Sequence, residues 1–101
     1  MPAYAVIIRE HLRDQSEMDK YSSSNREGPS HKMKILAMYG PHETVEGAAD
    51  EGCVLIEFPD MAAARAWYDS PGYQKARRHR WLGADYRIFF VEGLPEPMQV
   101  G

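Results

Sequence analysis

The stretch of sequence that decides the fold runs from residue 45 to residue 73 and reads VEGAADEGCVLIEFPDMAAARAWYDSPGY. A turn at Glu46-Gly47 precedes an apolar, β-branched segment that predicts a strand at Cys53–Phe58. Pro59-Asp60 ends that strand. Asp60 is also a favourable N-cap for an alanine-rich helix, which we expect at Met61–Asp69.

A second helix is expected directly after the first. Ser70 can cap it, and Pro71 falls in its first turn, where the missing N–H costs no hydrogen bond. We expect this helix to reach about Arg80. Its basic run at 75–80, KARRHR, could hold a phosphate, but cations at the end of a helix also complement the helix dipole. A solvated helix end is therefore the simpler interpretation for most of these residues.

The remainder of the chain predicts one more helix and three more strands. Ser16 and Asp19 have the spacing of a capping box, and Gly28-Pro29 is a stop signal for the helix that they would open. Met18 and Tyr21 are its expected buried anchors. The expected strands are 3–10, 33–39, 53–58 and 86–92, and the expected helices are 16–25, 61–69 and 71–80.

This order, β-α-β-β-α-β with the second helix in two pieces, is that of a ferredoxin-like α+β fold with an antiparallel sheet. The helices of such a fold cover one face of the sheet. The strands at 53–58 and 86–92 are largely apolar on both faces; Phe89 and Phe90, for example, point to opposite sides. The sequence therefore predicts a homodimer in which a second copy covers the uncovered face.

Composition limits the classes of function. A chain of 101 residues is the size of one small domain, expected at 1–95 with a C-terminal tail at 96–101 that could be loose or grip a partner. A net charge of −3 and a pI of about 5.8 argue against nucleic-acid binding. No apolar run reaches the length of a membrane span, so we expect no membrane partner and a cytoplasmic location.

Four segments together resemble a known family. They are the VEG turn at 45–47, VLIEFPD at 54–60, ARAWYDSPGYQ at 64–74 and VEGLP at 91–95. In combination they are similar to the domain-of-unknown-function 1330 family of the dimeric α+β barrel superfamily. The resemblance implies the fold, a dimer and an arginine near Arg80. It implies no activity, because the superfamily includes monooxygenases without cofactors, haem-degrading enzymes, isomerases and stress-induced proteins.

Two acidic residues are candidates for chemistry. Glu57 lies in an otherwise apolar strand and could be a proton acceptor with a raised pKa. The structural alternative is an ion pair with Arg9 or Arg87 on a neighbouring strand. We expect this ion pair rather than a catalytic role. Glu46 could be an acid at the mouth of a pocket, or it could hydrogen-bond to amides of its own turn.

Further candidates could line a pocket between the sheet and the helices. Tyr39 and Tyr73 could form aromatic walls for a small planar ligand, although Trp67 beside them is expected in the core. His42 follows a Gly-Pro stop, where it could face a pocket or simply solvent. Arg80 is the basic residue that the family resemblance singles out.

We expect no metal and no cofactor. The single cysteine, Cys53, excludes a disulfide within the chain and a cysteine-based zinc cluster. The four histidines, at positions 11, 31, 42 and 79, have no helix-face spacing with one another.

Two classes of function remain open. The first is a small-molecule binder, or an enzyme that needs no cofactor, with its pocket between the sheet and the helices. The second is a non-catalytic dimeric structural or interaction module. Enclosed polar groups in apolar walls would favour the first class, and a filled interior would favour the second.

Overall fold

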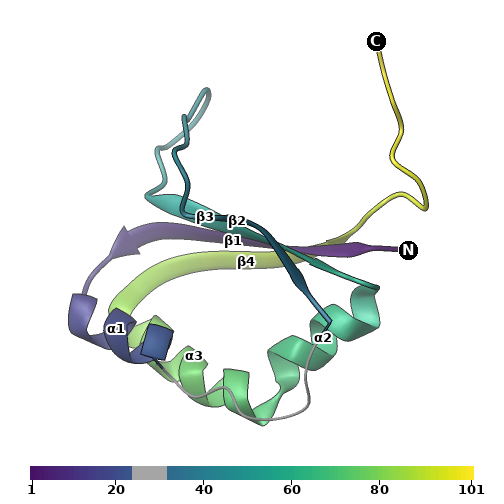
Figure 1. The fold of residues 1–101 in the computed structure, drawn as a ribbon. Coiled ribbons are helices and arrows are strands. Elements are labelled where there is room, and N and C mark those ends of the chain that lie inside the picture. The colour runs from purple at the N-terminus through teal and green to yellow at the C-terminus, as the bar shows by residue number, and fades with distance from the viewer. Residues whose placement is uncertain (24–31) are drawn as a thin grey trace.

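The computed structural model describes residues 1–23 and 32–101. It has one antiparallel sheet with all its helices on one side (Figure 1). The observed order confirms the α+β, ferredoxin-like prediction. In chain order the elements are β1 (Ala3–Leu12), α1 (Gln15–Ser23), β2 (Lys34–Met38), β3 (Gly52–Phe58), α2 (Met61–Asp69), α3 (Pro71–Gly83) and β4 (Ala84–Glu92).

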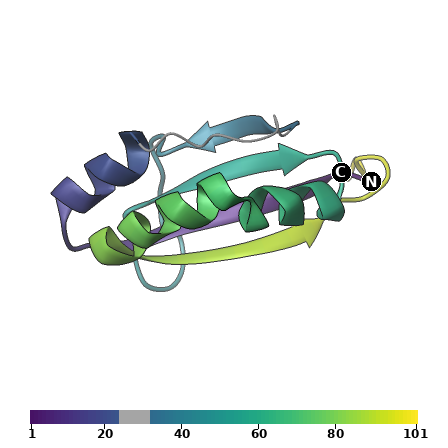
Figure 2. The same cartoon turned by 90° about the horizontal axis from the view of Figure 1, so that it is seen from below.

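The sheet has the strand order β2-β3-β1-β4, and every neighbouring pair is antiparallel. On the central strand, Val6 lies opposite Leu55 on one side and Phe89 on the other. Figure 2 shows α2 and α3 crossing β1, β3 and β4, while β2 lies beyond them at the edge of the sheet. All five residues of β2 are accordingly exposed.

The core lies between the sheet and the two later helices. Trp67 is buried as expected, and its ring centroid is 4.3 Å from that of Tyr73 and 5.5 Å from that of Phe58. Tyr73 is only 1% exposed, so it belongs to this core. The core cluster consists of Ala5, Ile7, Val54, Ile56, Phe58, Ala64, Trp67 and Tyr73.

The caps of α2 and α3 are those that the sequence predicts. The Asp60 carboxylate accepts a hydrogen bond from the Ala63 amide at 2.7 Å, and the Ser70 hydroxyl accepts one from the Tyr73 amide at 3.4 Å. With Pro71 in its first turn, α3 then continues beyond Arg80 to Gly83.

The capping box expected at Ser16 and Asp19 is wrong. Helix α1 begins one residue earlier than expected, so Asp14 is the capping residue. Its Oδ1 accepts hydrogen bonds from the Ser16 amide at 3.0 Å and from the Ser16 hydroxyl at 2.7 Å. The Ser16 hydroxyl, with the amides of Ser16 and Glu17, lowers the pKa of the Asp14 carboxyl. The expected end of this helix, with its stop signal at 28–29, lies outside the described residues.

Strand ends also differ from the expectation. β1 is two residues longer, and β4 begins two residues earlier, because backbone pairing continues to Leu12 opposite Ala84. β3 gains Gly52 at its start. β2 is shorter and ends at Met38, because Tyr39 has a positive φ of 49°, which leaves extended geometry.

A close contact holds α1 against the end of α3. A Cβ built on Gly83 would lie 2.8 Å from Met18 Cγ, so only glycine allows this approach. The Gly83 carbonyl accepts hydrogen bonds from the amides of Arg13 and Asp14 at 2.7 and 2.9 Å. As a result, α1 packs against the last turns of α3, the helix that carries Arg80.

An ion pair joins the same two helices. The Nδ1 of His79 lies 2.8 Å from the Glu17 carboxylate, and Lys20 Nζ lies 3.1 Å from it. These partners, His79 first, lower the pKa of Glu17 below its ordinary value of 4.5. A carboxylate with a lowered pKa stabilises the folded state above that ordinary value and loses its contribution as the pH falls through the lowered one.

A Glu17→Gln variant should therefore show a weaker acid dependence of stability. The free energy of unfolding of the native protein should fall from pH 4.5 downward more steeply than that of the variant. Urea unfolding followed by circular dichroism between pH 3 and 7 checks this. Glu43→Gln, in the exposed β2–β3 loop, is the matched control and should parallel the native protein. Parallel curves for Glu17→Gln and the native protein would contradict the assignment.

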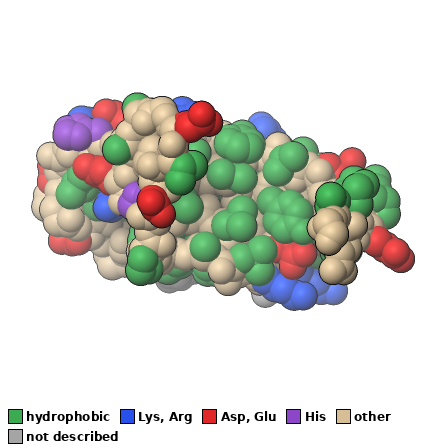
Figure 3. Space-filling model, turned by 90° about the horizontal axis from the view of Figure 1, so that it is seen from above, with side chains coloured by type: hydrophobic (Ala, Val, Ile, Leu, Met, Phe, Trp, Pro, Cys, Tyr) green, Lys and Arg blue, Asp and Glu red, His purple; other side chains and the backbone are tan. Residues whose placement is uncertain are grey.

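The face of the sheet opposite the helices is open and apolar (Figure 3). Phe89 is 50% exposed and Val91 is 46% exposed, which confirms that β4 has two apolar faces. The β2–β3 loop and the C-terminal tail both project on this side, from opposite ends of the sheet (Figure 1). Within the described residues, no helix has the length and hydrophobicity that a membrane span requires.

Candidate functional site

The candidate site lies on the helix side of the sheet, where β1 ends and β4 begins. Arg9 on β1 is opposite Gly52 on β3 and Tyr86 on β4. Tyr39 enters from the end of β2, and Arg80 enters from the last turns of α3. Residues on or next to four elements, β1, β2, α3 and β4, therefore bring two arginines and two tyrosines together.

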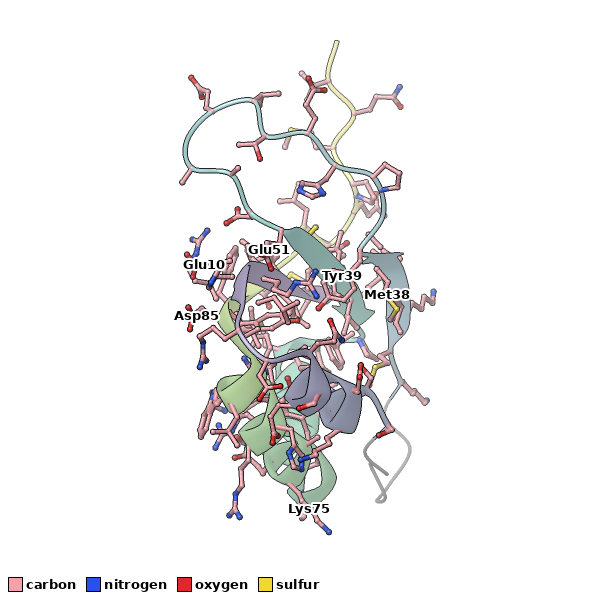
Figure 4. All side chains as sticks on the ribbon, turned by 90° about the vertical axis from the view of Figure 1, so that its left-hand side faces the viewer. Glu10, Met38, Tyr39, Glu51, Lys75 and Asp85 are labelled. Atoms are coloured by element: carbon pink, nitrogen blue, oxygen red, sulfur yellow. The ribbon has the colours of Figure 1, made fainter. Side chains whose placement is uncertain are left out.

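Tyr39 closes the end of this group. Its ring packs over Gly52, where an added Cβ would lie 2.9 Å from Tyr39 Cδ1. Its amide donates a hydrogen bond to the Cys53 carbonyl at 2.8 Å, which fixes its backbone beside β3. Its hydroxyl lies 2.5 Å from that of Tyr86. Figure 4 looks at this end of the molecule and shows Tyr39 near Glu51, with Lys75 far away on the helix layer.

Arg80 is the most unusual residue of the site. It is 4% exposed, and its Cζ lies 5.3 Å from the centroid of the Tyr86 ring. Its Nε is buried without a hydrogen-bond partner among the described residues, as are the Nε atoms of Arg9 and Arg77. In the part of the chain that the structure describes, Arg80 takes part in no ion pair, and other basic residues make all of them. The positive charge of Arg80 is thus enclosed without a carboxylate partner from the described residues.

Arg9 differs from Arg80 because its charge is balanced locally. Its Cζ lies 5.0 Å from the centroid of the Tyr39 ring, and its Nε is 3.2 Å from Glu51 Oε1. Glu51 is itself held in place, because the same oxygen accepts a hydrogen bond from the Leu12 amide at 2.8 Å. The net charge of the group is therefore that of Arg80.

The Tyr86 hydroxyl is a neutral hydrogen-bonding group. Burial raises the pKa of Tyr86, and its hydrogen bond with Tyr39 raises it further. A phenol in that state keeps its proton at physiological pH. One hydroxyl of the pair donates to the other, and the accepting hydroxyl still has a proton of its own to donate.

Tyr73 lies deeper, in the core next to the site. Its hydroxyl is 3.2 Å from the hydroxyl of Tyr21, which connects α3 to α1. The rings of the two tyrosines meet edge to face at 82°. Tyr73 therefore supports the helix layer behind Arg80 and is itself almost inaccessible.

The β2–β3 loop holds two of the other candidates. His42 is exposed, and its Nε2 lies 2.9 Å from the carbonyl oxygen of Asp50, so it braces the loop. Glu46 is also exposed, next to Gly47, which has the positive φ of 88° that the turn requires. The structure brings neither residue next to Arg80 in a single subunit.

The expected partners of Glu57 are wrong. Its carboxylate lies 4.0 Å from Lys34 Nζ, whereas Arg9 pairs with Glu51 and Arg87 pairs with Glu10. The reason is register, because Glu57 is opposite Tyr4, near the start of β1, and both arginines lie toward the other end of the sheet. The Glu57 side chain is 27% exposed, so the pair contributes little to stability.

Glu57 borders a hollow at that opposite end. Its volume is about 510 Å³. It is predominantly apolar. Its lining residues are Pro2, Lys32, Met33, Lys34, Glu57, Phe58 and Pro59. The structure thus separates the six sequence candidates: Tyr39 and Arg80 both contact Tyr86, and Glu57 lies apart from them.

Sequence reasoning missed Tyr86 and the pairing of Arg9 with Glu51. Tyr86 alternates with Ile88 and Phe90 along β4, and this pattern could have placed it on the helix side. The pairing of Arg9 with Glu51 has no comparable signal, because it depends on how the β2–β3 loop returns to the sheet. Across residues 1–23 and 32–101, no group of three or more His, Cys, Asp or Glu residues could hold a metal ion.

Comparison with known families decides the classification of the chain. A model of the domain of unknown function DUF1330 matches residues 2–94. The chain belongs to the DUF1330 family. This match extends from the start of β1 to just beyond β4, so it includes every residue of the site described above. No curated protein matches the chain.

Solved structures agree with this DUF1330 fold. One is RPA0582, a protein of unknown function from Rhodopseudomonas palustris, with 18% identity and a TM-score of 0.70 over 94% of this chain and 84% of that one. Another is methylated RPA0582, with 16% identity and a TM-score of 0.70 over 97% and 84% of the two chains. At such identities the likeness shows the fold alone.

Proposed function

We propose that this DUF1330 protein is a homodimer in which each subunit binds a small molecule at the end of the sheet–helix interface. The binding group consists of Arg80, Tyr86 and Tyr39. The observation that carries the proposal is the enclosed guanidinium of Arg80, which has no ion pair among the described residues.

The physical reason is the cost of burying a charge. An ionised group removed from water is expensive unless a counter-charge and hydrogen bonds compensate it. An arginine kept for stability alone would be expected to have a carboxylate beside it, as Arg9 has Glu51. Uncompensated charged groups beside polar and aromatic side chains are typical of binding sites.

The dimer follows from the open face of the sheet. Phe89 and Val91 are about half exposed there, and the projecting β2–β3 loop and C-terminal tail border the face. A second copy of the same face has matching shape and hydrophobicity. Leu94, just before the tail, and Met98 and Val100 within it are exposed and are available to contact that copy. We propose the tail as an arm of the interface.

Replacing Arg80 should reveal whether it serves stability or binding. Without ligand, the free energy of unfolding of Arg80→Met should equal or exceed that of the native protein. The reason is that removing an uncompensated buried charge relieves its desolvation cost. Urea unfolding at equal protein concentration measures this. Arg78→Met, an exposed position on the same helix, is the control. A loss of about 3 kcal/mol or more at Arg80 alone would indicate a structural role.

Binding itself can be tested without knowing the ligand. Native mass spectrometry of freshly purified protein detects a retained molecule, and two-dimensional NMR with a panel of neutral and charged aromatic fragments locates weaker binding. We expect shift changes centred on Tyr39, Arg80 and Tyr86. If no fragment of any charge perturbs these residues and no molecule co-purifies, the protein is better described as a non-catalytic dimeric module.

A further inference from the structure

The charge of the site indicates what kind of molecule it takes. We infer that the ligand is a small organic monoanion whose carboxylate binds Arg80 and whose planar body lies against the tyrosine rings. This inference rests on the proposed function and adds a ligand class to it.

The charges around Arg80 largely cancel one another. Arg9 and Glu51 lie 3.2 Å apart and cancel, and His79 on the same helix as Arg80 faces Glu17 at 2.8 Å. Tyr86 keeps its proton and adds no charge. One positive charge, that of Arg80, is left enclosed, so a single negative charge on the ligand neutralises the site. A phosphate dianion would leave an excess of negative charge.

The hydrogen-bond donors of the site have a geometry that suits a carboxylate. A guanidinium presents its N–H groups in a planar fork that matches a carboxylate with two parallel hydrogen bonds. The Nε of Arg80 is buried without a hydrogen-bond acceptor among the described residues, so a carboxylate bound beside it would satisfy this donor. The hydroxyl pair of Tyr39 and Tyr86, 2.5 Å apart, still has one proton to donate nearby.

The exposure of the site residues indicates what the body of the ligand is like. Tyr39 is 41% exposed, whereas Arg80 behind it is 4% exposed. The site is therefore polar and charged at its inner end and aromatic at its outer end. A planar apolar body attached to the carboxylate can rest against the exposed part of the Tyr39 side chain, which favours an aromatic acid over a fully polar anion.

Calorimetric titration with three probes at pH 7 tests the inference. The probes are benzoate, its neutral isostere benzamide, and inorganic phosphate. Because charge-assisted hydrogen bonds are about twice as strong as neutral ones, benzoate should bind at least about tenfold more tightly than benzamide. It should also bind more tightly than phosphate. Arg80→Met should remove the preference for benzoate, and Arg78→Met should keep it.

A second variant guards against a folding defect in Arg80→Met. Tyr86→Phe removes one hydroxyl of the donor pair and keeps the ring, and it should weaken benzoate binding several-fold. Benzamide binding at this site as tightly as benzoate would overturn the monoanion inference while the proposed function stands. Phosphate binding as tightly as benzoate would overturn the carboxylate assignment. If none of the three binds there, the ligand class is wrong, and the fragment panel separately decides the proposed function.

Discussion

A Phe89→Lys variant is expected to be monomeric at concentrations where the native protein is dimeric. Phe89 is 50% exposed in one subunit and lies at the middle of the open sheet face, opposite Val6. Burying one such side chain contributes about 1.5–3 kcal/mol, and the proposed two-fold interface would contain two copies. Losing both should raise the dissociation constant roughly 100-fold or more.

Sedimentation velocity across a range of concentrations measures this effect. Trp81→Lys is the matched control, because Trp81 is also about half exposed, at 51%, but lies on α3 in the helix layer. It should leave the dimer intact. A native protein that stays monomeric at high micromolar concentration, or a Phe89→Lys variant that dimerises as the native protein does, would contradict the proposed interface.

The second large effect is expected at Trp67. Its ring packs against Phe58 and Tyr73 and is 5% exposed, so its removal leaves a cavity in the centre of the core. Trp67→Ala should lower the free energy of unfolding by about 3–5 kcal/mol. That is a large share of the stability of a domain of this size, which is typically about 5–15 kcal/mol.

Chemical unfolding followed by far-ultraviolet circular dichroism is the appropriate measurement, because the substitution removes a fluorophore. Trp81→Ala removes the same side chain from an exposed position and should cost much less. Equal losses at the two tryptophans would show that Trp67 does not anchor the contact between the helices and the sheet.

The fold was predictable because its local signals agree with one another. Asp60 and Ser70 cap the helices that follow them, and the apolar alternation of β3 and β4 sets their faces. Element ends were less predictable, because long-range contacts determine them. For example, α3 continues to Gly83 because the carbonyl of that residue accepts two hydrogen bonds from the β1–α1 connection.

The candidate site was only partly predictable. Tyr39 and Arg80 could be identified as polar or aromatic residues close to the ends of their elements. Tyr39 and Arg80 both contact Tyr86, and these contacts depend on the sheet register. The register places Arg9 opposite both Tyr86 and Gly52. The partner of Glu57 was wrong for the same reason, since a residue pattern shows which face a side chain occupies but not how far along the sheet its neighbours lie.

The enclosed guanidinium of Arg80 is proposed to bind the carboxylate of an aromatic acid. The most direct measurement is the NMR signal of the Arg80 Nε–H group, assigned by its absence in Arg80→Met and followed as benzoate is added at pH 7. We predict that this signal shifts downfield and exchanges more slowly with solvent as a hydrogen bond to the carboxylate forms. An Arg80 Nε–H signal that stays unchanged at saturating benzoate would contradict the account.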